Sequence, residues 1–390
     1  MHQHPSTEEL AAWIRLAMEP GLGPAQARQL LAAVGLPQDI YRLSTPSLAK
    51  HLPHDLARQL AGPAAEPVTK AIALAEKWLA EPGHHILTLA DPAYPAALLD
   101  SHDPPLMLYV NGLLDTLAHP AIAVVGARSA TAGGTDNATA FSSYLANQGW
   151  CIVSGLAHGI DAAAHEGALR AGGRTIATLA TGADLVYPAA NRDLAHRIAK
   201  QGALISEFPL GTRALPYQFP KRNRIVAGLA RGVLVVEAAK KSGSLITARL
   251  ASEMGREVFA IPGSIHSPLS RGCHELIRQG AKLVESGQDI HEELGKPLGT
   301  PAGAVQPAVE LASSDSPVCA DTRPVQPRLP LFDPETPEAQ VLDALGYDPV
   351  DTDVLQCRTG LEVARLVAVL MQLELTDVVE RLGDGRYQRR

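Results

Sequence analysis

The chain has 390 residues, of which 46% are hydrophobic and 4% aromatic, and its net charge is −7. This length predicts two or three domains with an aliphatic core. No apolar signal region opens the chain and no run approaches the ~18 apolar residues of a spanning helix, so we expect a cytoplasmic protein without membrane contact. Four cysteines form no CxxC pair, which argues against a structural zinc site and predicts that Cys151 and Cys357 are reduced, buried thiols.

Residues 1–80 read as a helical domain. TEELAAWIRLAME fits an amphipathic helix opened by Thr7, and a Gly-x-Gly turn then leads into a second helix, PAQARQLLAAVG. Such a turn resembles a helix–hairpin–helix, whose backbone N–H groups can hold a phosphate. A small packed helical bundle is the favoured alternative, because few basic residues surround the turn.

The pattern changes at residues 85–295, which predict an α/β core. Short apolar runs are separated by roughly 15–25 residues that can hold a helix. This alternation is typical of a buried parallel sheet with helices on both faces. The runs are AIAVVG, WCIVSG, TIATLATG, ALISE, GVLVVEA, EVFAIPG and AKLVES.

Two further segments complete the chain. Residues 296–337 hold nine prolines without periodicity, which predicts a flexible linker. Residues 338–390 read as three helices followed by a hairpin on a Gly-Asp-Gly turn, which together suggest a winged helix.

Positive charge gathers in residues 219–249, where seven lysines and arginines accompany one acid, Glu237. The local charge is +6, which leaves −13 for the rest of the chain (−7 − 6). Exposed charges more than about 10 Å away are largely screened at ordinary salt. The segment can therefore attract an anion although the protein is acidic.

The predicted strands end in small and polar residues, and ligands of such sheets bind beyond the strands' carboxyl ends. The first strand leads into Gly126, Arg128 and Ser129, and the second into Ser154 and Gly155. Another predicted anion site opens the helix LITARLASEMG, because a Ser cap and unpaired N–H groups stand beside two lysines. Its residues are Lys240, Lys241, Ser242, Gly243 and Ser244. An ordinary capped helix is the alternative.

A third basic group lies at the predicted start of the helix IVAGLA. Lys221, Arg222 and Arg224 are unfavourable at a helix N-terminus, which suggests that a bound anion offsets the cost. Asn223 can donate to a phosphate or cap the helix. Phe219 can stack on a base or act as a hydrophobic staple.

Catalytic signatures are largely missing. No P-loop, G-x-S-x-G elbow or G-x-G-x-x-G fingerprint occurs. His158, Asp161 and His165 could hold a metal, but polar contacts or helix caps explain them more simply. Glu207, Glu237 and Asp184 could do acid–base chemistry or pair with the arginines.

Six stretches together resemble the DNA-processing protein A (DprA/Smf) family, in family order over about 170 residues. They are VVGARSAT, VSGLAHGIDAAAHEGAL, TIATLATGADLVYPAANRDL, ISEFPLGT, FPKRNRIVAGLARGVLVVEAAKKSGSLITARLASEMGREVFAIPG and RGCHELIRQGAKLV.

This resemblance implies an extended Rossmann-like core between an N-terminal helical (SAM/helix–hairpin–helix-like) domain and a C-terminal winged-helix-like domain. It also implies a homodimer that binds single-stranded DNA in a basic pocket, protects incoming strands and helps load RecA during natural transformation, without a cofactor. By motif position, Arg128 contacts phosphate, and the FPKRNR segment and the region from Lys240 to Ser244 line the same pocket.

Two other classes of function compete. The same anion pocket would serve a nucleotide- or phosphoribosyl-processing enzyme, although the P-G-G-x-G-T type of loop is absent. A pure interaction scaffold would leave the clustered arginines unexplained. For a dimer, the segment HELIRQGAKLV offers a candidate two-fold apolar patch, with core packing as the equal alternative. Its apolar residues are Leu276, Ile277, Leu283 and Val284.

Overall fold

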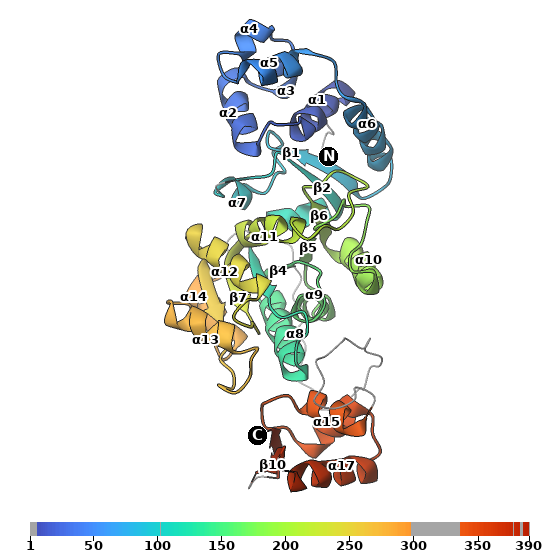
Figure 1. The fold of residues 1–390 in the computed structure, drawn as a ribbon, viewed down its shortest axis with the longest axis vertical. Helices are drawn as coiled ribbons and strands as arrows, with labels where there is room; N and C mark the ends of the chain where they lie inside the picture. The colour runs from blue at the N-terminus through green and yellow to red at the C-terminus, as the bar shows by residue number, and fades with distance from the viewer. Residues whose placement is uncertain (1–5, 102, 298–335, 377, 383–384, 390) are drawn as a thin grey trace.

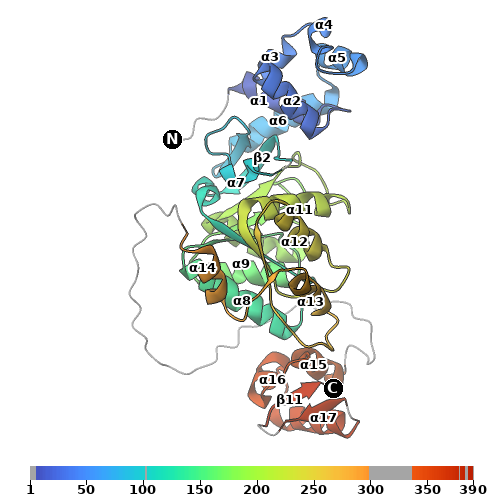
Figure 2. The ribbon, with the colours of Figure 1, turned by 90° about the vertical axis from the view of Figure 1, so that its left-hand side faces the viewer.

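The computed structural model describes residues 6–101, 103–297, 336–376, 378–382 and 385–389. An N-terminal group of helices, a central α/β part and a C-terminal group follow one another along the long axis of the molecule (Figures 1 and 2). Most of the predicted linker, residues 298–335, lies outside the described residues. Within the described residues, none of the helices is long and apolar enough to cross a bilayer.

The N-terminal group is helical, as predicted. Leu10, Trp13 and Ile14 of the first helix are almost fully buried, which is the i, i+3, i+4 spacing of one helix face. The cap is Ser6 rather than the predicted Thr7, because the Ser6 hydroxyl accepts from the Glu9 amide. The helices are α1 (Thr7–Met18), α2 (Pro24–Val34), α3 (Pro37–Tyr41), α4 (Thr45–Leu48), α5 (His54–Ala61) and α6 (Glu66–Leu79).

The central part of the described chain is a nine-stranded sheet in the order β1-β2-β6-β5-β4-β3-β7-β8-β9. All seven predicted runs form strands, β3 to β9, and pair in parallel with one another. The strands are β1 (His84–Thr88), β2 (Met107–Gly112), β3 (Ala121–Val125), β4 (Cys151–Ser154), β5 (Thr175–Thr178), β6 (Ala203–Ser206), β7 (Ala230–Val235), β8 (Glu257–Ala260) and β9 (Lys282–Leu283).

Two antiparallel strands at one edge were not predicted. β1 pairs with β2, and β2 pairs with β6, both antiparallel. The sheet is therefore mixed, although mostly parallel. This edge joins the N-terminal helices to the core, because Ile86 of β1 and Met107 of β2 pack in the same hydrophobic cluster as Trp13.

Helices cover both faces of the sheet, and alternate residues of β3 face opposite layers. Ala121, Ala123 and Val125 pack toward the face covered by α11, α12 and α13. Ile122 and Val124 pack toward α8, α9 and α14. The remaining elements of this part are α7 (Ala96–Leu99), η1 (Leu114–Ala118), α8 (Ala132–Asn147), α9 (Ile160–Arg170), η2 (Ala189–Asn191), α10 (Arg192–Gln201), α11 (Gln218–Leu229), α12 (Gly243–Glu253), α13 (Arg271–Arg278) and α14 (Gly287–Leu294).

The C-terminal group has the predicted winged-helix order of three helices and a hairpin. Arg358 ties it to the core: its guanidinium lies 2.6 Å from the Asp136 carboxylate on α8. Cys357 is exposed, which corrects the prediction of a buried thiol, whereas Cys151 is buried as expected. The elements are α15 (Pro337–Leu345), α16 (Thr352–Thr359), α17 (Val363–Leu375), β10 (Val379–Arg381) and β11 (Tyr387–Arg389).

Candidate nucleic-acid interface

The strand order switches sides between the parallel strands β3 and β7, and the two loops that leave these strands are tied together. β3 lies between β4 and β7, so successive connections run to opposite sides of it. The Glu237 carboxylate, just after β7, accepts hydrogen bonds from the amide (3.0 Å) and hydroxyl (2.5 Å) of Thr131. Ligands of open α/β sheets bind at such a switch point. The bond therefore fixes the loop of residues 126–131, which carries Arg128, at the expected site.

The backbone of that loop lies close to its neighbours. A Cβ on Gly126 would lie 2.6 Å from Ile160 Cγ1 and 2.9 Å from the Glu237 carbonyl oxygen. Only glycine fits there without a shift of these groups. Farther along the same loop, Arg128 and Ser129 are exposed. The loop thus has a tightly packed base and a free tip.

Arg222 is a structural side chain rather than an open contact. It is 4% exposed, and its guanidinium donates to the Thr178 carbonyl oxygen. Burial lowers the pKa of Arg222 to about 10, although the nearby Asp161 carboxylate opposes the shift. A Cβ on Gly155 would overlap the guanidinium. Arg222 therefore supports the loop after β4 from beneath and is closed to a ligand in this conformation.

Asp161 fixes the same loop from its other side. Its carboxylate accepts from the amides of Gly155 (3.1 Å) and Ala157 (3.3 Å). Burial raises its pKa, and Arg222 opposes that rise. Ser154, predicted as a contact, is fully buried and donates to the Val124 carbonyl oxygen. The loop after β4 is thus held by buried polar groups and presents its backbone to the crevice.

Arg224, predicted to face a bound anion, is instead engaged in ion pairs within the protein. Its guanidinium lies 2.6 Å from Glu207 and 3.3 Å from Asp103, and only 11% of the side chain is exposed. Arg28 of α2 pairs with the same Asp103 at 2.6 Å. Arg224 therefore belongs to an ion-pair network that joins the N-terminal helices to α11.

The helix that carries these arginines starts earlier than predicted, at Gln218. One turn of helix faces several directions, so neighbouring cations have different surroundings. Lys221 is 43% exposed and lies 3.6 Å from Glu207. Of the three cations predicted there, Lys221 is the one open to solvent.

An exposed cation and two aromatic rings form the open part of the crevice. The Arg128 guanidinium carbon lies 5.2 Å from the Phe219 ring centroid, and the Tyr187 ring is 5.7 Å from Phe219 at 60°. Arg128 makes no ion pair within the part of the chain that the structure describes. A cavity of about 60 Å³ lies beside the rings. It is lined by Arg128, Gly155, Ala157, His158, Ala180, Tyr187, Pro188 and Phe219.

Sequence reasoning missed Tyr187, whose side chain is 52% exposed. The available signal was its place in the segment LVYPAAN after the exit of β5, because an aromatic next to proline in a strand-exit loop is held rigidly and is not needed for the core. His158, for which a polar contact was the simpler prediction, lines the small cavity.

The start of α12 matches the predicted capped helix. Ser242 is the N-cap, and its hydroxyl lies 2.7 Å from the Ser244 hydroxyl. Lys240 and Lys241 are exposed beside it. Asn223 of α11 donates to the Gly243 carbonyl oxygen at 3.3 Å, so the start of α12 adjoins the helix that carries Phe219 and Lys221. Phosphate binding at this helix start stays a prediction.

The three residues weighed as metal ligands have other uses. His165 is fully buried and its Nδ1 lies 2.7 Å from the Thr175 hydroxyl. Burial, assisted by Arg222, lowers the pKa of His165 to about 3. Asp161 caps backbone amides, and His158 lines the small cavity. Across the described ranges, no three His, Cys, Asp or Glu residues are grouped as metal ligands.

The four apolar residues predicted for a dimer interface divide in two. Leu283 is 46% exposed on β9, the edge strand of the sheet. Leu276 and Ile277 are partly buried against the core, and Val284 is fully buried among core residues. Val284 is therefore closed to a partner, because its side chain completes the core beneath β9.

Comparisons with known proteins agree on one family. The family model described as DNA recombination-mediator protein A matches residues 85–295, and the DprA winged helix domain matches residues 325–385. Protein Smf of Escherichia coli K12 is 41% identical over 309 residues, covering 79% of this chain and 78% of that protein. DNA processing protein DprA of Streptococcus pneumoniae is 50% identical over 206 residues, covering 53% and 73%. The X-ray structure of the S. pneumoniae protein superposes with a TM-score of 0.63 at 37% identity, covering 75% of this chain and 99% of that one.

Proposed function

Since the chain belongs to the DNA recombination-mediator protein A family, we propose that it binds single-stranded DNA, with little regard to sequence, at the crevice between β3 and β7. The observation that carries this proposal is the grouping of exposed Arg128 and Tyr187 with the half-buried Phe219 at the strand exits. Aromatic faces stack on any base, and a free guanidinium attracts phosphate, so the combination tolerates all sequences.

The surrounding surface supports the same function. Lys221, Lys240 and Lys241 are exposed beside the crevice, and the start of α12 supplies N–H groups that a phosphate can accept from. A strand that follows these groups would contact several phosphates. Binding is then strongly salt-dependent, because each contact releases a counterion.

The proposal is tested by fluorescence anisotropy with labelled 20-nucleotide strands of dT, dA and mixed sequence. Arg128→Ala and the double change of Lys240 and Lys241 to Ala should weaken binding to all three strands alike. Each lost phosphate contact should flatten the salt slope by about 0.7. Arg170→Ala, an exposed arginine of the core outside the crevice, is the control. Unchanged affinity and slope in the crevice variants would place the DNA site elsewhere.

Phe219 and Tyr187 are tested separately because stacking involves no counterion. Phe219→Ala and Tyr187→Ala should each weaken binding by about 1–3 kcal/mol. The salt slope should stay that of the wild type. A slope that changes with either aromatic would mean that the ring acts by positioning Arg128 rather than by stacking.

The chain is proposed to act as a mediator and not as a nucleotide-processing enzyme. Glu237, the acid closest to the switch point, has both carboxylate oxygens engaged by Thr131, which leaves it poorly placed to accept a substrate proton. Incubation with ATP, nucleoside monophosphates and labelled strands should release no product. Turnover by the wild type that disappears in Glu237→Gln would instead favour a nucleotide-processing enzyme.

The working unit is proposed to be a homodimer that holds one strand and passes it to RecA in the cytoplasm, during natural transformation or recombination. A crevice of this size covers a handful of nucleotides, and two linked crevices make the second contact intramolecular, which raises avidity by ~100-fold or more. The RecA role rests on family membership. It is tested by RecA filament assembly on strands coated with this protein, where assembly no faster than on coated strands of an unrelated binding protein would contradict it.

A further inference from the structure

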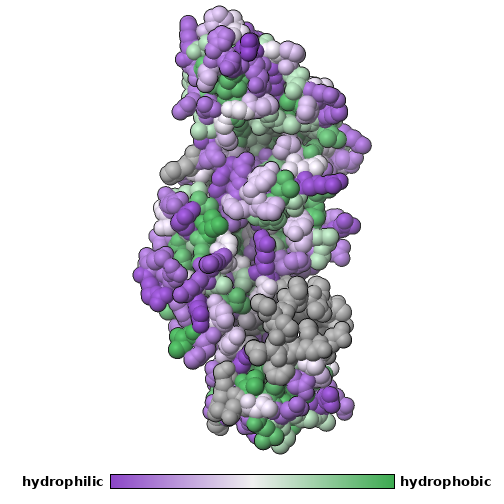
Figure 3. All heavy atoms as spheres, viewed as in Figure 1, coloured by the Kyte–Doolittle hydropathy of each residue, from purple (hydrophilic) through white to green (hydrophobic). Residues whose placement is uncertain are grey.

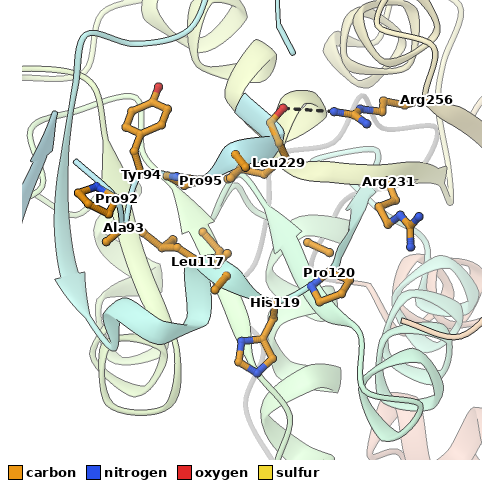
Figure 4. A pocket seen from close by; sticks show the side chains of 15 residues that line it. Pro92, Ala93, Tyr94, Pro95, Leu117, His119, Pro120, Leu229, Arg231 and Arg256 are labelled. Carbon is orange, nitrogen blue, oxygen red and sulfur yellow. Dashed lines mark hydrogen bonds between the residues drawn. The ribbon is translucent and has the colours of Figure 1, made fainter. Parts of the chain in front are cut away.

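A second hollow, shown in Figure 4, lies at the end of the parallel strands where they begin. It has a volume of about 460 Å³ and includes Ala121, the first residue of β3, and Arg231, near the start of β7. The DNA crevice lies beyond the other ends of these strands. Since a strand rises about 3.3 Å per residue, the length of the sheet separates the two sites. Ligands at one site therefore leave the other open.

The walls of this hollow combine apolar surface with polar groups. Pro92, Pro95 and Pro120 carry no backbone N–H, and Leu117 and Leu229 add aliphatic surface between them. The hydroxyl of Tyr94 is already engaged, because it donates to the Pro105 carbonyl oxygen at 2.8 Å. The walls thus offer apolar contact beside polar groups, among them the ring of His119.

The charge at this hollow is positive and incompletely balanced. Arg231 is exposed and makes no ion pair or hydrogen bond with any other described residue. Arg256 uses one nitrogen on the Ala97 carbonyl oxygen (3.2 Å) and the Asp100 carboxylate (3.1 Å), while its buried Nε has no partner in the described residues. The fifteen lining residues include no acid.

We propose that this hollow, here called the proline pocket, binds a small anion with an aromatic or branched aliphatic body and one phosphate or carboxylate group. Its volume lies within the range of about 300–1,000 Å³ that is usual for small-ligand sites. The body packs between the prolines and leucines. The anionic group pairs with Arg231, whose planar fork suits both phosphate and carboxylate.

The test is calorimetric titration of the full chain with phenyl phosphate and with benzoate. The protein is first saturated with oligo-dT, so that the DNA crevice cannot take the probe. Inorganic phosphate and phenol are titrated in parallel, because each carries only half of the proposed recognition. At least one aryl anion should bind roughly tenfold or more tightly than either half, as expected for one charge-assisted contact added to apolar burial.

Two variants and one control locate the binding. Arg231→Ala removes the free guanidinium, and Ala118→Phe fills the hollow from an exposed position of η1. Each variant should bind the aryl anion about tenfold more weakly than the wild type. Its affinity for oligo-dT should stay unchanged. Arg170→Ala, an exposed arginine away from the pocket, should behave as wild type. The proposal would be overturned if neither aryl anion gave binding heat. It would also be overturned if the wild type and both pocket variants bound the aryl anion with equal affinity.

Discussion

Thr131 and Glu237 lie 106 positions apart in sequence and share two hydrogen bonds, with the Thr131 amide and hydroxyl both donating to the Glu237 carboxylate. The same hydroxyl accepts from the Gly134 amide and so caps α8. Thr131 therefore both anchors the loop that carries Arg128 and caps α8. Removing the hydroxyl should disturb the proposed DNA site without removing any of the groups proposed to contact DNA.

Thr131→Val tests this relationship, because it keeps the shape of the side chain and removes only the hydroxyl. We expect a loss of about 1–2 kcal/mol in the free energy of unfolding, from the lost cap and the lost bond to Glu237. Strand affinity should fall while the salt slope stays unchanged, since no phosphate contact is lost. Urea unfolding and anisotropy at several salt concentrations measure both. Thr139→Val is the matched control and should leave strand affinity unchanged, because the Thr139 hydroxyl donates to the Thr135 carbonyl oxygen of α8 and the Ala163 carbonyl oxygen of α9, away from the Arg128 loop.

Adjacent residues of α11 should respond oppositely to the same substitution. Arg222→Ala leaves the buried Asp161 charge uncompensated and opens a cavity, so the free energy of unfolding should fall by about 3–5 kcal/mol. Lys221→Ala removes an exposed side chain, so its stability should stay within about 0.5 kcal/mol of wild type while its strand affinity falls. Chemical unfolding and anisotropy of both variants decide the point. A stable Arg222→Ala protein that binds weakly would show that Arg222 contacts DNA directly.

Arg222 and Arg224 show what the sequence could and could not predict. The strand-forming runs of the parallel core and the capped start of α12 follow from local patterns, because each depends on residues close together in the chain. The burial of Arg222 depends on Thr178 and Gly155, which are distant in sequence. The pairing of Arg224 depends on Glu207 and Asp103. Counting charges therefore located the basic segment but could not separate its structural cations from its open ones.

The antiparallel edge was missed for a related reason. β2 is almost entirely buried, with a burial pattern that has no polar alternation. Such runs give no period that distinguishes a strand from a buried helix. Only pairing with β6 decides their structure.

His165 should make the fold sensitive to acid. Burial lowers the pKa of His165 to about 3, whereas the unfolded chain has the ordinary value of about 6.5. Between these values the unfolded state binds the extra proton, so the free energy of unfolding falls as the pH drops below about 6.5. From pH 7 to 5 one such group contributes a loss of about 2 kcal/mol.

The measurement is urea unfolding of wild type and His165→Gln at pH 7.5, 6.5, 5.5 and 5.0. The variant loses some stability at neutral pH but should show a shallower decline below pH 6.5. Parallel curves for the two proteins would assign the acid sensitivity to other groups.

The edge strand β9 is where a two-fold interface should be sought. Leu283 is 46% exposed there, whereas Val284 is fully buried. Leu283→Arg should therefore dissociate the proposed dimer without unfolding it, and strand affinity should fall because avidity is lost. Sedimentation at micromolar concentration measures the assembly. Val284→Arg, in contrast, should unfold the core. A Leu283→Arg protein that sediments as the wild type does would exclude β9 from the interface.

The C-terminal domain should contribute little to strand binding. Residues 338–390 hold ten acids and six arginines, a net charge of −4. The outward side of α17 exposes an apolar series, Val363, Val367, Met371 and Leu375, and apolar side chains are visible over this end of the molecule in Figure 3. A helix that reads duplex DNA needs polar groups for base edges and positive charge for phosphates. This helix suits contact with a protein better.

Ending the chain at residue 297 removes this domain together with its ion pair from Arg358 to Asp136. Because Arg128, Phe219 and Lys240 all stay in place, anisotropy should give a strand affinity within a few-fold of the full chain, with the same salt slope. Arg358→Ala in the full chain is the matched variant, since it releases the contact with α8 and keeps the domain. A loss of affinity in the truncated chain but not in Arg358→Ala would mean that the domain itself holds DNA. An equal loss in both would mean that docking on α8 supports the Arg128 loop, because Asp136 lies on the helix that Thr131 caps.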